Sequence, residues 1–269
     1  MVVWRLLKLE THDAFTNMAI DEAIMAARIK DSVPSTIRFY RWKPSGVSIG
    51  RFQSLEREIL LENCAKHRID MVRRISGGGA VYHDHSGEIT YSVVALRDDF
   101  EATGATTVYR RIYLGLAEAL RVLGLRADFN EGNLKACPNL TVNGRKISGS
   151  AQAHRKGVIL QHGTLLVDVD LMKMFRFLRV PSHRTCSETA EAADEKITSI
   201  QSELGREVQA TEVCRALIEG FQRTFDIRLA ESRLTPFEMD TAERLRTEKY
   251  ASSHWNSGGK TEADLRIQA

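Results

Sequence analysis

LTVNGRKISGSAQAHRKGVILQHGT, residues 140–164, is the stretch that decides how this chain folds. Its runs at 140–142, 145–148 and 158–167 are short and rich in Val, Ile, Leu and Thr, which is typical of β-strands. The pair Asn143-Gly144 separates the first two runs, and such a pair is a strong signal for a tight hairpin turn. The stretch therefore predicts a β-hairpin, with Lys146 projecting just after its turn.

A second stretch, RRISGGGAVYHDHSGEITYSVV at residues 73–94, supplies chemistry that complements the first. Its triple glycine Gly77-Gly78-Gly79 lacks Cβ atoms, so backbone N–H groups can approach an anion closely. The fork of an arginine such as Arg74 fits a carboxylate or phosphate bidentately, whereas a lysine such as Lys146 is a compact charge that can bridge two negative oxygens. Together the two stretches predict a pocket for an activated carboxylate.

The rest of the chain mixes helical and strand patterns without a regular βαβ alternation. Apolar residues at helical spacing predict a helix that follows Thr16, with Asp21 and Glu22 in its first turn, where the helix dipole favours acids. The same spacing predicts helices at about 108–123 and from about residue 211 onward. Further short strands are expected at 46–50, 71–75 and 88–94.

Composition excludes several classes of protein. With 38 basic and 35 acidic residues the net charge is only +3, which is too balanced for a nucleic-acid-binding surface. The four cysteines show no CxxC spacing, and Arg5 and Lys8 interrupt the apolar start of the chain, unlike a secretion signal. There is no apolar run of about 18 residues that could span a membrane. We therefore expect a cytoplasmic protein that binds neither nucleic acid nor membrane.

The order of several motifs resembles one known family. The pattern RRxSGGGAVxHD at 73–84, followed by NGRKISGSAQ at 143–152 and QHGTLL at 161–166, resembles the catalytic domain of lipoate-protein ligases and the related octanoyltransferases. The segment NMAIDEA at 17–23 and the pair Trp255-Asn256 are similar to that family too. The resemblance thus covers nearly the whole chain.

The resemblance implies an α+β fold, with a mixed, largely antiparallel sheet flanked by helices as in biotin and lipoate ligases. The catalytic domain would span residues 1–256, including a helical closing segment at about 197–229. Residues 257–269 would form a flexible tail. Longer ligases of the family carry an additional accessory domain after this point, so we expect a separate small protein to supply it.

The main functional prediction from the resemblance is an ATP-dependent ligase. Lipoate or octanoate would react with ATP, assisted by Mg²⁺, to give an acyl-adenylate, and a lysine of a lipoyl carrier would then take the acyl group. The carrier would be a glycine-cleavage H-protein or the lipoyl domain of a dehydrogenase E2 subunit. Lys146 would be the catalytic residue, and ATP and lipoate would contact Arg74, Ser76, Gly77, Gly78, Gly79, Ala80, Val81, Tyr82, His83, Gly149 and His162.

The alternative prediction is an octanoyltransferase that needs no ATP. In some members of the family a loop cysteine takes the acyl group as a thioester and a neighbouring lysine activates it. Cys137, in the sequence ACPNL shortly before Lys146, is the candidate nucleophile. Where the ligases commonly carry Asn-Asp ahead of this strand, the chain has Pro138-Asn139, which removes a carboxylate that could assist a metal ion.

The sequence disfavours three other interpretations. His83 and His162 lack the spacing of metal ligands, so no metal site on the protein is predicted. The GRGRxxxxW signature of biotin-protein ligases is missing, which disfavours biotin as the substrate. A non-enzymatic module that binds a carrier or a ligand would not need to keep Lys146, Arg74 and the glycines together, which favours an enzyme.

Overall fold

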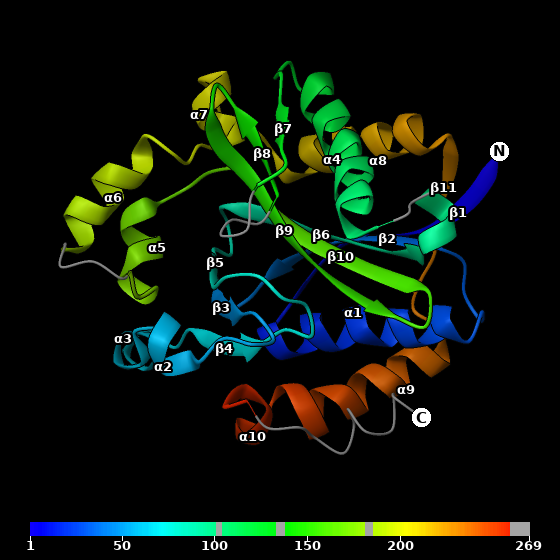
Figure 1. Ribbon diagram of the computed structural model, residues 1–269, viewed down its shortest axis with the longest axis horizontal. Helices are drawn as coiled ribbons and strands as arrows, with labels where there is room; N and C mark the ends of the chain where they lie inside the picture. Colours follow the sequence, from blue (N-terminus) through cyan, green and yellow to red (C-terminus); the bar gives the residue numbers. More distant parts are fainter. Residues whose placement is uncertain (101–103, 133–137, 181–184, 259–269) are drawn as a thin grey trace.

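A mixed sheet of eight strands forms the centre of the protein (Figure 1). The computed structural model describes residues 1–100, 104–132, 138–180 and 185–258. Strand β1 pairs in parallel with β11 and β2, and the remaining neighbours pair antiparallel, which confirms the predicted largely antiparallel α+β fold. The order is β11 (Ile227–Glu231), β1 (Val2–His12), β2 (Thr36–Trp42), β6 (Glu88–Leu96), β10 (Val158–Leu166), β9 (Arg145–Arg155), β8 (Asn139–Val142) and β7 (Asp128–Asn130).

A smaller sheet lies beside the main one and holds the triple glycine. It contains β4 (Asp70–Arg73), β3 (Gly46–Ile49) and β5 (Val81–His83) in that order, and the glycines lie in the loop between β4 and β5. The short helices α2 (Leu55–Glu58), α3 (Leu61–Lys66) and α5 (Leu171–Phe177) surround its apolar core.

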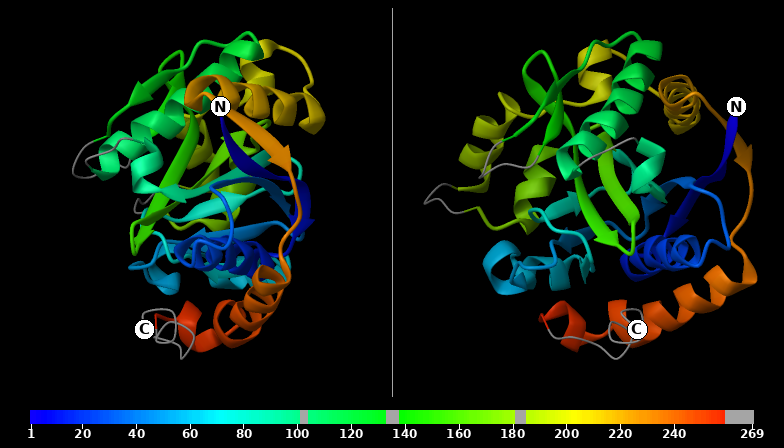
Figure 2. Two further views of the ribbon diagram at one scale, coloured as in Figure 1. Left: turned by 90° about the vertical axis from the view of Figure 1, so that its right-hand side faces the viewer. Right: turned by 45° about the vertical axis from the view of Figure 1, so that its right-hand side comes forward.

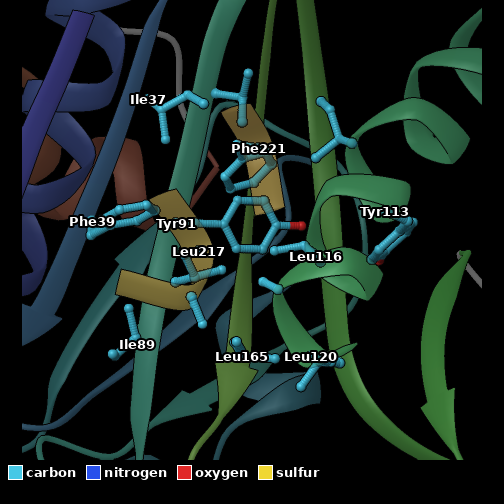
Figure 3. Packing of buried hydrophobic residues seen from close by; sticks show 14 of the residues in the cluster. Ile37, Phe39, Ile89, Tyr91, Tyr113, Leu116, Leu120, Leu165, Leu217 and Phe221 are labelled. Atoms are coloured by element: carbon cyan, nitrogen blue, oxygen red, sulfur yellow. The ribbon is translucent and has the colours of Figure 1, made fainter. Parts of the chain in front are cut away.

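Two long helices cover one face of the main sheet. Helices α4 (Ala105–Val122) and α8 (Ala210–Phe225) pack closely where α8 has Gly220. A Cβ on Gly220 would lie 2.5 Å from the backbone N of Ala119, so a larger residue would force the helices apart. Figure 3 shows how Tyr91 of β6 meets Phe221 of α8 and Leu116 of α4 in this core. The 3₁₀ helix η1 (Arg97–Phe100) contacts α4, and α7 (Ile200–Leu204) contributes Ile200 to the same core. Helix α6 (Cys186–Asp194) lies beside α5 (Figure 1).

The opposite face of the sheet is covered by α1 (Ala14–Ile29). The C-terminal elements α9 (Pro236–Leu245), the π-helical turn η2 (Arg246–Tyr250) and α10 (Ser253–Asn256) follow α1 on its outer side (Figure 2). In β6, side chains alternate between the two faces: Tyr91 faces the α4–α8 core, while Thr90 belongs to the α1 side. The α1 face of β6 therefore carries the polar residues Glu88, Thr90 and Ser92, followed by the apolar Val94.

The start of α1 differs from the prediction. The helix begins at Ala14, and Asp13 caps it by accepting a hydrogen bond from the Thr16 backbone N–H at 2.6 Å. Asp21 and Glu22 consequently lie well inside the helix, where both are buried and paired with cations. The expectation that they belong to the first turn was wrong, because the cap lies earlier than the apolar pattern indicated.

The predicted domain boundaries stay a prediction. Residues 197–229 include α7 and α8, and α8 packs on α4 as part of the main body. Of the predicted tail, residues 259–269 lie outside the described residues. Within the described parts of the chain, no helix is both long enough and apolar enough to cross a membrane.

Candidate functional site

A cavity of about 300 Å³ lies on the α1 face of the main sheet. A row of residues that lie opposite one another in the sheet crosses four strands beneath it: Gly149, Thr164, Thr90 and Tyr40. The triple-glycine loop and β5 form one wall, and α5 contributes Met174 and Phe175. This size is at the lower end of small-molecule pockets, about 300–1,000 Å³. The lining is mostly apolar, as an acyl chain requires.

Lys146 reaches this cavity because its strand contains a β-bulge. The hairpin turn is as predicted, with Asn143 and Gly144 at φ values of 51° and 77°. Leu140 pairs with Ser148 but Thr141 pairs with Lys146, so Ile147 is an extra residue on β9. Regular alternation would send Lys146 to the same face as Ser148, away from the cavity. The bulge instead re-aims it onto the face of Gly149.

The position of the Lys146 ammonium is defined by Gly149. A Cβ built on Gly149 would lie 2.8 Å from Cε and 2.9 Å from Nζ of Lys146, so the lysine side chain lies across the glycine. The backbone of Lys146 is fixed as well, since its N–H donates to Lys196 at 2.7 Å and its carbonyl accepts from Thr198 at 2.9 Å. The side chain is exposed and lines the cavity, which places it at the opening.

Arg74 holds the glycine loop from behind. Its guanidinium donates to the carbonyls of Gly77 at 2.8 Å and Gly79 at 3.0 Å. It also donates to Ser76 Oγ at 3.3 Å and to the carbonyl and hydroxyl of Ser48 at 3.0 and 2.8 Å. These bonds occupy all five N–H donors of a guanidinium. Arg74 thus organises the loop, and contact between its donors and a substrate anion stays a prediction.

Two buried histidines lie beneath the cavity. His162 Nδ1 is 3.0 Å from Asp21 Oδ2, and burial lowers the pKa of His162 more than the hydrogen bond to Asp21 raises it. Burial by itself raises the pKa of Asp21, but the hydrogen bond with His162 and the charge of Arg38 outweigh it and hold the pKa below its ordinary value. His83 Nδ1 lies 2.7 Å from Glu88. Each imidazole is therefore oriented by a buried carboxylate.

The C-terminal residues of the resemblance support the same loop. Arg73 donates to the carbonyls of Trp255 at 3.0 Å and Asn256 at 2.7 Å, and its backbone N–H donates to the Asn256 side chain at 2.7 Å. Arg73 also donates to the carbonyl of Gly50 at 3.2 Å. A Cβ on Gly50 would lie 2.1 Å from the carbonyl oxygen of Gly78, so Gly50 must be glycine for the two loops to touch.

Most of the predicted site residues meet at this cavity. Two of them, Ser76 and Gly77, do not line it. Instead, the hydroxyl of Ser76 and the carbonyl of Gly77 accept hydrogen bonds from Arg74. Cys137 lies outside the described residues, but the next residue, Pro138, lines the cavity. The predicted residues that do line it are Arg74, Gly78, Gly79, Ala80, Val81, Tyr82, His83, Lys146, Gly149 and His162.

Sequence reasoning missed the residues that other elements contribute. Met18 of α1 and Tyr40 and Trp42 of β2 line the cavity, and none of them was assigned to the site from the sequence. Asp21 and Glu88, which orient the two histidines, were not assigned to the site. Among the residues that the structure describes, no cluster of three His, Cys, Asp or Glu side chains could hold a metal ion.

Eight known proteins of similar sequence are octanoyltransferases by name. The octanoyltransferase LipM of Brevibacillus brevis is 36% identical, covering 95% of this chain and 99% of the relative. The octanoyltransferase LipM of Kyrpidia tusciae is 39% identical, with 95% and 99% covered. Six further proteins with this name are 34–37% identical.

A solved structure agrees in fold. The bipartite lipoate protein ligase of Thermoplasma acidophilum, studied with its E2 lipoyl domain, superimposes with a TM-score of 0.83 at 33% identity. The match covers 96% of this chain and 97% of that protein.

These findings correct the main functional prediction. The sequence was expected to encode an ATP-dependent lipoate ligase that forms an acyl-adenylate, yet the full-length relatives are octanoyltransferases by name. That prediction was wrong, and the ATP and Mg²⁺ that it required have no support from these relatives. The motifs around the glycines and the lysine did not separate the two activities, because this chain is similar over nearly its whole length both to octanoyltransferases and to a lipoate protein ligase.

The family itself is established over most of the chain. Residues 13–222 match the lipoyl protein ligase A/B catalytic domain, and this range contains the cavity, the glycine loop and Lys146. The chain is therefore an enzyme of protein lipoylation and belongs to the lipoyl protein ligase A/B catalytic domain family.

Proposed function

We propose that this chain transfers an octanoyl group from acyl carrier protein to a lysine of a lipoyl carrier protein, through a thioester on Cys137. The observation that carries the proposal is that Lys146 and Pro138, the residue directly after Cys137, line one apolar cavity. The full-length similarity to octanoyltransferases supports the same reaction.

In the first step the thiolate of Cys137 attacks the carbonyl carbon of the octanoyl thioester. A new carbon–sulfur bond forms, the bond to the thiol of the acyl carrier breaks, and the departing sulfur takes up the proton that Cys137 released. The exchange is nearly balanced in energy because one thioester replaces another, so no nucleotide is consumed.

In the second step the neutral amine of the carrier lysine attacks the Cys137 thioester. A carbon–nitrogen bond forms, the carbon–sulfur bond breaks, and the amine proton returns to the sulfur. The product amide is more stable than the thioester, which drives transfer forward. The acceptor would be an H-protein or an E2 lipoyl domain.

Lys146 would assist both steps as a cation. An ammonium near a cysteine favours the thiolate and lowers the pKa of the thiol. It also stabilises the negative charge that develops on the thioester oxygen in each transition state. A reactive thiol stays reduced in the cytoplasm, where we propose that the reaction takes place.

The test is a transfer assay with octanoyl-acyl carrier protein and a lipoyl domain, with and without ATP and Mg²⁺, followed by mass spectrometry of the lipoyl domain. We expect octanoylation without ATP, its loss in Cys137→Ser and a strong reduction in Lys146→Ala. Circular dichroism of the two variants controls for folding. Product that forms only when ATP is present would contradict the proposal.

A further inference from the structure

Two chains of hydrogen bonds run from Arg74 to buried carboxylates. In the first, Arg74 Nε lies 3.3 Å from Ser76 Oγ, and Ser76 Oγ lies 2.6 Å from His162 Nε2. His162 Nδ1 then contacts Asp21 Oδ2 at 3.0 Å. Asp21 also accepts from Arg38, Tyr40 and Ser92, so this end of the chain is fixed to α1, β2 and β6.

The second chain has the same chemical order on the other side of Arg74. Arg74 Nη1 donates to Ser48 Oγ at 2.8 Å, and Ser48 Oγ lies 2.8 Å from His83 Nε2. His83 Nδ1 contacts Glu88 Oε1 at 2.7 Å. Trp42 stacks on the imidazole of His83 with ring centroids 3.8 Å apart, which fixes the plane of that ring.

The direction of each chain follows from which groups can donate. An ionised carboxylate only accepts, so each histidine donates its Nδ1–H to Asp21 or Glu88. In the neutral imidazole Nε2 is then an acceptor, and it takes the hydroxyl hydrogen of the serine. The serine oxygen keeps lone pairs that accept from Arg74. Both chains therefore run from one guanidinium through a serine and a histidine to a carboxylate.

A nucleophilic role for the two serines conflicts with their burial. Acid, histidine and serine in this order are also the parts of a hydrolytic triad. However, Ser48 and Ser76 are both 0% exposed, although Ser48 borders the cavity, and each already accepts a hydrogen bond from Arg74. Their hydroxyls thus serve as links between the guanidinium and the histidines.

The orientation of Arg74 determines how the glycine loop faces the cavity. Arg74 draws the carbonyls of Gly77 and Gly79 toward itself. In a trans peptide the N–H of the following residue points opposite to the carbonyl, so the amides of Gly78 and Ala80 point away from Arg74. Neither amide donates to a backbone acceptor in the described part of the protein, and both residues line the cavity.

We propose that the two chains, Asp21–His162–Ser76 and Glu88–His83–Ser48, are positioning residues that fix Arg74 and thereby aim the amides of Gly78 and Ala80 at the acyl carbonyl. Two such amides would stabilise the oxyanion of the thioester transition state. The identity of the acyl group rests on the proposed function. The claim that Arg74 holds the triple-glycine loop in place does not.

The first arm of the test measures loop order by NMR relaxation of the amides of Gly77, Gly78 and Gly79. In the natural protein we expect order parameters near 0.85, the value of a rigid backbone. Ser48→Ala and Ser76→Ala should each lower them to below about 0.6, the flexible range. The matched control is Ser35→Ala, which removes a buried hydroxyl bonded to Asp99 far from the cavity, and it should leave them unchanged. Unchanged order in both link variants would overturn the proposal.

The second arm measures octanoyl transfer by the same variants. We expect kcat to fall about tenfold or more in Ser48→Ala and Ser76→Ala, with KM for the lipoyl domain within about twofold, as for groups that act in the transition state. In an Arg74→Lys background the additional Ser48→Ala change should cost less than about twofold, because Ser48 acts through Arg74. A full tenfold loss in that background would show direct contact with the substrate and refute the positioning role.

The two arms separate the two claims. If the natural protein fails to transfer octanoate at all, the proposed function is wrong, and the NMR arm still decides whether the two chains fix the loop. If transfer occurs and the link variants keep both loop order and kcat, the proposed function stands and the positioning role fails.

Discussion

Gly149→Ala offers a way to move the Lys146 ammonium without removing its charge. The added Cβ would lie 2.8 Å from Cε and 2.9 Å from Nζ, both at the far end of a flexible side chain. Lys146 must therefore retreat by about 0.5–1 Å to reach ordinary contact distances. The strand backbone itself accepts alanine, and a compatible Gly→Ala change is often stabilising by about 0.4–1 kcal/mol.

We expect the variant to fold normally and to transfer octanoate about 10 to 100 times more slowly, because displacing a reacting group by about 1 Å can cost about a hundredfold. The assay is initial-rate transfer to a lipoyl domain, together with urea unfolding to measure the free energy of unfolding. That free energy should stay within about 1 kcal/mol of the natural protein.

The double variant Lys146→Ala, Gly149→Ala sharpens this test. If Gly149 matters only by leaving room for the lysine, the double variant should be no slower than Lys146→Ala alone. A normal rate for Gly149→Ala would refute the assigned position of the ammonium. An additional loss in the double variant would show that Gly149 acts independently of Lys146.

Three further outcomes follow from buried contacts. Gly163→Ala should lower the free energy of unfolding by about 1–3 kcal/mol in a urea titration, because its Cβ would lie 2.4 Å from the backbone oxygen of Gly149, which cannot yield; an unchanged unfolding midpoint would contradict that packing. Lys249→Met should cost about 1–3 kcal/mol, since it removes the ammonium 2.9 Å from the buried Glu22 carboxylate, which retains Arg155 and Tyr250 as partners; an unchanged free energy of unfolding would contradict the pairing. Burial alone raises the pKa of Glu22, but Lys249 and Arg155 outweigh it and hold the pKa below 4.5 in the folded protein. The stability that Glu22 contributes should therefore be complete above about pH 4.5 and decline as the pH falls through the folded pKa. In Glu22→Gln the free energy of unfolding should fall less between pH 7 and pH 4 than it does in the natural protein. An equally large fall in that variant would assign the loss of stability to other groups.

Local sequence signals were enough to predict the hairpin and the class of fold. Asn143-Gly144 specifies left-handed backbone at two successive residues, a requirement that few other pairs meet, and the structure confirms the turn. Helices α4 and α8 were found because each buries one continuous apolar stripe in the same core.

The bulge at Ile147 could not be predicted in the same way. It depends on the register between β8 and β9, which is a property of two strands and not of either sequence alone. Without it, alternation sends Lys146 to the wrong face. The prediction that Lys146 follows the hairpin turn on a strand was correct. The register between the strands is what explains why its ammonium reaches the cavity.

The burial of two acidic residues was also not predicted from the sequence. Asp21 and Glu22 look like ordinary surface residues of a helix, and their pairing with Arg38 and Lys249 joins segments that are far apart in the chain. The same is true of Arg73 and Asn256. Contacts of this kind are set by tertiary packing, which carries no local pattern.

The most direct measurement of the central claim is peptide mass mapping after the protein meets octanoyl-acyl carrier protein with neither acceptor nor nucleotide present. We predict a single octanoyl adduct on the peptide that contains Cys137, sensitive to hydroxylamine and released when a lipoyl domain is added. Absence of the adduct while transfer still proceeds, or an adduct on another residue, would contradict the account.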